Sequence, residues 1–224
     1  RDNLRRAQDF NSSAPHYSVA LGDAYMEDGD KRNMDFYWKV AQQSNSNFTP
    51  AAGRVLYSRV FKGEKKDALD AELKRLKALP ETMRGPKGDY AIALAEAAML
   101  LQRGQTSEVL TLINASPVQD VHILYLKAKA LMAENKVDEG MAAWKQVLSL
   151  APGSTFYYFA AVKSYSAKEK HEEAIALLDT KKTDYEKDVE YQVAYGNALI
   201  AKADYPAASA SFDKALKLQE NFAD

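Results

Sequence analysis

The order of small and large residues in this chain repeats every 34 residues. Each copy has a small or medium-sized residue, a small residue twelve positions later and a large residue four positions after that. These triplets are Gly196, Ala208 and Phe212; Val162, Ala174 and Leu178; and Ala128, Gly140 and Trp144. A period of this length indicates stacked structural repeats, each of which buries its apolar face only against its neighbours.

Each copy is predicted to be a pair of antiparallel helices. The segment 191–218 contains two helical stretches that meet at Ala203-Asp204-Tyr205-Pro206, and Asp28-Gly29-Asp30 is a similar turn. The small residues allow the two helices to approach closely, and the large residues fill the space between consecutive pairs. The predicted fold class is therefore all-α.

The same register divides the chain into segments. Residues 1–14 are predicted to be the second helix of a truncated upstream repeat, and residues 15–82 to form units one and two. Residues 83–88 are predicted to be an irregular linker, because Pro86 and two glycines interrupt the helical pattern. Residues 89–222 are predicted to form units three to six as one continuous array, and we expect the sequence to be a piece of a longer chain.

Composition excludes several classes of protein. Lys and Arg number 30 against 31 Asp and Glu, so no basic excess indicates nucleic-acid binding. The chain has no cysteine, which excludes disulfides and thiolate metal sites. No apolar run approaches the roughly 20 residues needed to span a bilayer.

The repeat resembles the tetratricopeptide repeat (TPR), whose pattern is W-x2-L-G-x2-Y followed by A-x3-F-x2-A-x4-P. The matching residues are Leu21, Gly22, Tyr25, Trp38, Ala41, Gly140, Trp144, Ala174, Leu178, Gly196, Ala208, Phe212 and Ala215. The resemblance covers about six units plus the leading helix. It implies a right-handed superhelical solenoid of antiparallel helix pairs.

The sequence contains no recognisable catalytic, cofactor or metal motif. The three histidines are far apart, and His171-Glu172-Glu173 lacks the second histidine of H-E-x-x-H. No phosphate-binding or dinucleotide-binding glycine motif is present. We therefore expect a protein that is not an enzyme and that needs no cofactor.

The resemblance implies a binding groove lined by the second, fifth, ninth, twelfth and thirteenth positions of each unit. In units four to six the predicted partner-binding residues are Tyr125, Lys129, Phe156, Phe159, Lys163 and Asn197. The same positions also include Glu190 and Val193. Aromatic rings beside Lys and Asn suit an extended peptide, but the rings can equally pack against the adjacent helix pair, and the sequence leaves both possibilities open.

Three hypotheses about function follow. The first is a non-enzymatic scaffold that binds an extended segment of a protein partner in its concave groove. The second is a bacterial envelope factor for exopolysaccharide export or outer-membrane assembly, with a polysaccharide as a possible ligand and the periplasm as the expected compartment. The third is a regulatory domain fused to an enzyme outside this segment.

Overall fold

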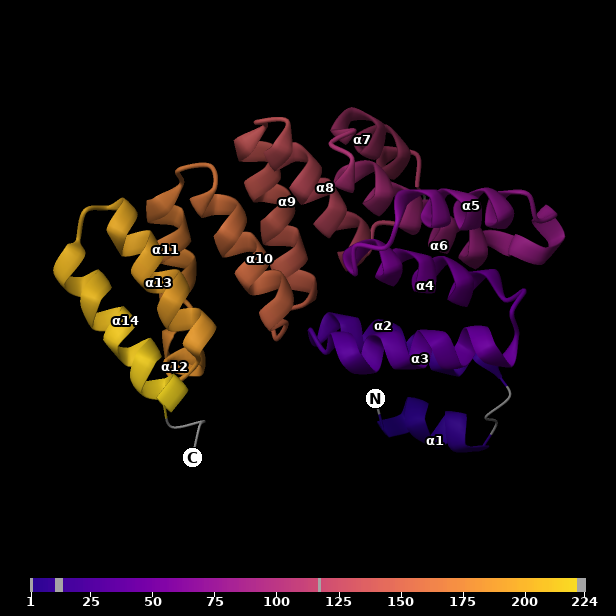
Figure 1. The fold of residues 1–224 in the computed structure, drawn as a ribbon, viewed down its shortest axis with the longest axis horizontal. Coiled ribbons are helices and arrows are strands. Elements are labelled where there is room, and N and C mark those ends of the chain that lie inside the picture. The colour runs from indigo at the N-terminus through magenta and orange to yellow at the C-terminus, as the bar shows by residue number, and fades with distance from the viewer. Residues whose placement is uncertain (1, 11–13, 117, 221–224) are drawn as a thin grey trace. The chain divides into compact units, whose positions relative to one another are not determined.

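The computed structural model describes residues 2–10, 14–116 and 118–220, and the regular elements in these ranges are all helices (Figure 1). The prediction of an all-α fold is confirmed. The helices form two compact units, residues 1–154 and 155–224. The right-handed superhelix and the division into six units stay predictions.

The first unit contains a leading helix and helices that alternate along the chain as first and second members of pairs. These helices are α1 (Asp2–Phe10), α2 (Pro15–Glu27), α3 (Lys31–Ser44), α4 (Thr49–Phe61), α5 (Lys66–Lys77), α6 (Glu81–Gln102), α7 (Thr106–Asn114), α8 (Val121–Ala133) and α9 (Val137–Leu150). Helices α2 and α3 pack along each other, as do α8 and α9.

The second unit consists of two helix pairs with a single helical turn between them. Its helices are α10 (Thr155–Ser166), α11 (His171–Asp179), α12 (Lys182–Tyr185), α13 (Val189–Ala201) and α14 (Tyr205–Glu220). The short helix α12 follows α11 directly, and Asp188 caps α13 by accepting a hydrogen bond from the Tyr191 amide at 2.9 Å.

The turns within the helix pairs carry the 34-residue period in their backbone conformation. In the described residues, each of these turns has one residue with left-handed φ; they are Gly29, Gly63, Gly104, Asn135, Glu169 and Ala203. Successive residues are 34 apart from Gly29 to Gly63 and from Asn135 through Glu169 to Ala203. The interval from Gly63 to Gly104 is 41 residues, so the repeat is interrupted between these two turns.

The interruption coincides with a break in helix α6. Residues 83–88 are predicted to be an irregular linker, but helical conformation continues to Arg84 and resumes at Pro86, with only Gly85 outside it (φ 59°, ψ 172°). The hydroxyl of Thr49 lies 3.0 Å from the carbonyl oxygen of Arg84 and can donate to it. Only one residue leaves the helical conformation, for two reasons. The Thr49 hydroxyl can take the place of the backbone N–H that the break removes from the Arg84 carbonyl, and Pro86 has no N–H that needs an acceptor.

The repeat positions lie in the cores of the two units. Leu21, Trp38, Ala41 and Trp144 are fully buried, whereas Phe212 is half-buried. A Cβ at Gly22 would lie 2.2 Å from Cδ1 of Trp38, and the atoms nearest Gly196 belong to the ring of Phe212. A small residue in the first helix of a pair thus leaves the space that a large residue of the second helix fills.

Helix α4 packs most extensively against α6, and Gly53 lies where the two helices are in close contact. An added Cβ at this position would lie 2.6 Å from the backbone carbon of Ala91. Because backbone cannot move aside as a flexible side chain can, we expect Gly53→Ala to lower the free energy of unfolding by about 1–3 kcal/mol.

Urea denaturation followed by tryptophan fluorescence measures this effect in the first unit, which contains Trp38 and Trp144. The matched control is Gly153→Ala, because no atom lies within 4 Å of its added Cβ. Equal stability of the Gly53→Ala and Gly153→Ala variants would contradict the close packing of α4 on α6.

Candidate functional site

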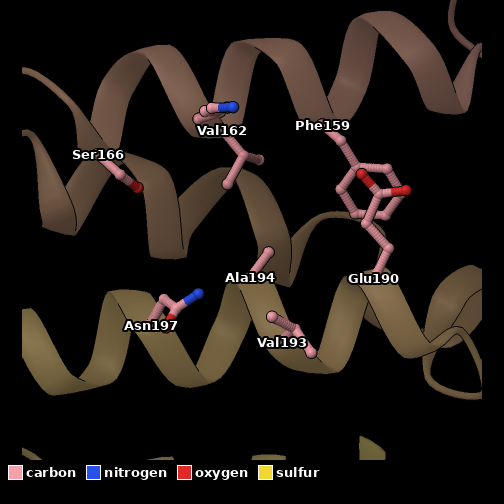
Figure 2. Close-up of a pocket in the computed structure, with 8 residues that line it drawn as sticks. Phe159, Val162, Ser166, Glu190, Val193, Ala194 and Asn197 are labelled. Atoms are coloured by element: carbon pink, nitrogen blue, oxygen red, sulfur yellow. The ribbon is translucent and has the colours of Figure 1, made fainter. Parts of the chain in front are cut away.

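A groove with a volume of about 330 Å³ lies between α10 and α13 in the second unit (Figure 2). Four residues from each helix line it: Phe159, Val162, Lys163 and Ser166 from α10, and Glu190, Val193, Ala194 and Asn197 from α13. Both sets have the spacing i, i+3, i+4, i+7, which places residues on one face of a helix. The groove is therefore formed by matching faces of two helices.

Two tyrosines connect these helices to neighbouring carbonyl groups of α11. The hydroxyl of Tyr158, in α10, lies 3.0 Å from the Leu177 oxygen and 3.2 Å from the Leu178 oxygen, and that of Tyr191, in α13, donates to the Leu178 oxygen at 3.1 Å. Burial raises the pKa of Tyr158 and raises that of Tyr191 to about 12, so both hydroxyls keep their protons at neutral pH. Both helices that line the groove are thus hydrogen-bonded to the same end of α11.

The groove has an apolar middle and polar ends. Figure 2 shows Val162 and Ala194 between a polar end with Ser166 and Asn197 and an opposite end where Glu190 points toward Phe159. The side chain of Phe159 is 9% exposed, whereas that of Val193 is 39% exposed. The arrangement offers an apolar surface together with hydrogen-bonding and charged groups.

Three of the six predicted partner-binding residues come together in this groove: Phe159, Lys163 and Asn197. Phe156 is half-buried and is not among the lining residues; its ring meets that of Tyr157 edge-on at 5.0 Å. The groove also contains Glu190 and Val193, which occupy predicted groove positions.

The other two predicted residues, Tyr125 and Lys129, lie in the first unit. Tyr125 is 3% exposed and contacts Trp144 edge-on at 5.7 Å, and burial raises its pKa to about 12. The ammonium group of Lys129 is 5.7 Å from the centre of the Tyr125 ring. Tyr125 is thus packed in the core, whereas Phe159, at the equivalent repeat position, borders the groove.

Sequence reasoning missed Val162 and Ala194 as lining residues and did not name Ser166, which lies at the twelfth position of unit five. The signal for them is the helical spacing itself, because each lies three, four or seven positions from a predicted residue on the same helix.

A second missed feature is a row of polar contacts across the first helices of the pairs in the first unit. Arg54 in α4 donates to both carboxylate oxygens of Asp23 in α2, at 2.6 and 2.7 Å. The Arg54 guanidinium lies 5.5 Å from the centre of the Tyr90 ring, and the Tyr90 hydroxyl donates to Asp120 at 2.5 Å. The signal in the sequence was a single charged residue, Arg54, in the middle of the stretch 51–57, AAGRVLY.

This row lies among the packed helices around α4. Arg54 is 8% exposed, and nearly every residue of α4 is buried. His122, at the start of α8, is also buried, and burial lowers its pKa, so it is neutral at pH 7. The polar groups here are satisfied by one another and form part of the core of the first unit.

The described residues contain no group of three or more His, Asp and Glu side chains able to hold a metal ion. Over the same part of the chain, the helices are too short or too polar to cross a membrane.

Comparison with known proteins identifies the last helix pair. Residues 189–222, which cover α13 and α14, match the family model for the tetratricopeptide repeat. No curated protein matches the sequence. The matched pair contains Gly196, Ala208 and Phe212, the triplet in which the 34-residue period is clearest. The family match, the paired helices and the recurring turns together show that this chain is a TPR-like repeat protein.

Proposed function

We propose that this protein is a non-enzymatic scaffold whose groove between α10 and α13 binds an extended segment of a protein partner. Tetratricopeptide repeats generally mediate protein–protein interactions. The observation that carries the proposal is the convergence of Phe159, Lys163 and Asn197 on one groove, beside the apolar side chains of Val162 and Val193.

The chemistry of the groove matches that of a peptide. Its volume of about 330 Å³ is near the lower end of the roughly 300–1,000 Å³ typical of ligand pockets. That space accommodates a large apolar side chain and the adjoining peptide groups. The Asn197 amide can donate to a backbone carbonyl and accept from a backbone N–H, whereas Lys163 can only donate.

Packing within the first unit is a further reason to propose the binding site in the second unit. Arg54 of α4 is buried in its contacts with Asp23 and Tyr90, and Tyr125 packs on Trp144. Accordingly, we assign the principal binding role to Phe159, Lys163 and Asn197. Further contacts by Tyr125, Lys129 and Phe156 remain predictions.

Selection of random peptides on the full chain, followed by fluorescence anisotropy of the selected peptides, tests the proposal. Val193→Trp adds a large ring to the lining of the groove at an exposed position. We expect it to weaken binding at least about tenfold, which corresponds to about 1.4 kcal/mol.

The matched control is Leu216→Trp on α14, because Leu216 is 59% exposed and does not line the groove. We expect this variant to bind like the parent chain, and circular dichroism checks that both variants are folded. Selected peptides that bind the Val193→Trp variant as tightly as the parent chain would refute the groove as the binding site.

A further inference from the structure

The groove carries opposite charges that are not neutralised within the protein. Lys163 and Glu190 are both exposed and both line it, yet neither side chain forms an ion pair with any residue that the structure describes. Other charges of the same unit do pair, since Lys202 lies 3.4 Å from Glu172 and Lys214 lies 3.6 Å from Glu186. The unpaired charges at the groove are therefore available to a ligand.

The positions of these groups give the groove a direction. Glu190 is at the end of the groove near Phe159, and Asn197 is at the other end beside Ser166 (Figure 2). Lys163 is one helical turn beyond Phe159 toward the Ser166 end. One end thus presents a carboxylate, and the opposite half presents an ammonium group and an amide.

The helical rise sets the length of ligand that meets both ends. Glu190 and Asn197 are seven residues apart on α13, which corresponds to about 10.5 Å along the helix axis. An extended chain advances about 3.3 Å per residue, so about three residues span this distance. A side chain between the two ends would lie over Val162, Val193 and Ala194.

From this geometry we infer that the groove selects an extended segment in which an apolar residue lies between one basic and one acidic side chain, two to four residues apart. The basic side chain pairs with Glu190, the acidic side chain pairs with Lys163 and accepts from Asn197, and the apolar residue occupies the middle. The carboxylate that pairs with Lys163 belongs to a side chain within the segment and not to the C-terminus of the partner. This inference rests on the proposed binding of a peptide in the same groove.

Complementary charges flanking an apolar contact chiefly determine which partners are accepted, because a like-charged partner is repelled. A single charge reversal makes both ends of the groove equal in sign, so the preferred segment finds only one complementary end. Reversal of both charges restores one end of each sign, and an extended segment can then bind in the opposite direction.

The test measures the affinity of a selected peptide, acetylated and amidated at its ends, for charge-reversed variants of the full chain. We expect Lys163→Glu and Glu190→Lys each to weaken binding about tenfold, and the double variant to recover most of that loss. The controls are Lys217→Glu and Asp213→Lys on α14, which change the net charge equally outside the groove. Both controls should bind like the parent chain.

The outcomes separate this inference from the proposed function. If Val193→Trp blocks binding but both charge reversals leave the affinity unchanged, the groove binds peptides without the inferred charge pattern. If the double variant binds as weakly as the single variants, or if amidation of the peptide abolishes binding, the inferred arrangement is wrong. If Val193→Trp does not affect binding, the proposed groove itself is wrong.

Discussion

Replacing Trp144 with alanine is expected to lower the free energy of unfolding of the first unit by about 3–5 kcal/mol. Trp144, in α9, is fully buried, and its ring contacts that of Tyr125 in α8. Removing the indole leaves a cavity that the surrounding helices fill only in part. Urea denaturation followed by the fluorescence of the remaining Trp38 measures the change, and an unchanged midpoint would contradict the repeat register.

Phenylalanine variants separate packing from hydrogen bonding at the two tryptophans. The indole N–H of Trp38 donates to Asp23 at 3.0 Å, whereas that of Trp144 finds no acceptor among the described residues. The residue fifteen positions before each tryptophan explains this difference, since it is Asp23 in one case and Lys129 in the other. We expect Trp38→Phe to cost about 1.5–3 kcal/mol more than Trp144→Phe, because only Trp38→Phe removes a hydrogen bond to a charged group.

Replacing Arg54 with methionine is expected to destabilise the first unit by about 3 kcal/mol. Methionine keeps most of the apolar stem but leaves Asp23 without its cation, and removal of one partner of a buried pair typically costs about 3–5 kcal/mol. The lower end of this range applies because the Asp23 side chain is 25% exposed and partly hydrated. Denaturation in urea at pH 7 measures the loss.

The double variant Asp23→Asn with Arg54→Met is the control for this effect. Asparagine keeps an oxygen that can accept from Trp38 but removes the charge that methionine cannot neutralise. We therefore expect the double variant to be more stable than Arg54→Met alone. If the two are equally unstable, lost packing of Arg54 on Tyr90 explains the effect instead of an unpaired carboxylate.

The candidate groove could be predicted from the sequence only in part. Repeat spacing assigned Tyr125 and Phe159 to equivalent positions, but it could not tell that Tyr125 is covered by Trp144 and that Phe159 borders an open groove. Equivalent positions differ because their neighbours come from other helices. The sequence contains the spacing along one helix but not the separation between two helices.

The sequence by itself determined the all-α class, the 34-residue period and the recurring order of small and large residues, such as Gly22 and Trp38. These features follow from local preferences and from a regular pattern, so each copy reinforces the others. The turns show the same period, with left-handed backbone at Asn135, Glu169 and Ala203.

Only the tertiary structure decided which repeat positions are packed in a core and which line an open groove. Arg54 meets Asp23 from 31 residues away, and Thr49 lies within hydrogen-bonding distance of the Arg84 carbonyl oxygen at the break in α6. Such contacts depend on the particular side chains that two packed helices bring together. For the same reason, Arg54 of α4 forms a largely buried ion pair with Asp23, whereas Lys163 and Glu190 line an open groove in the second unit.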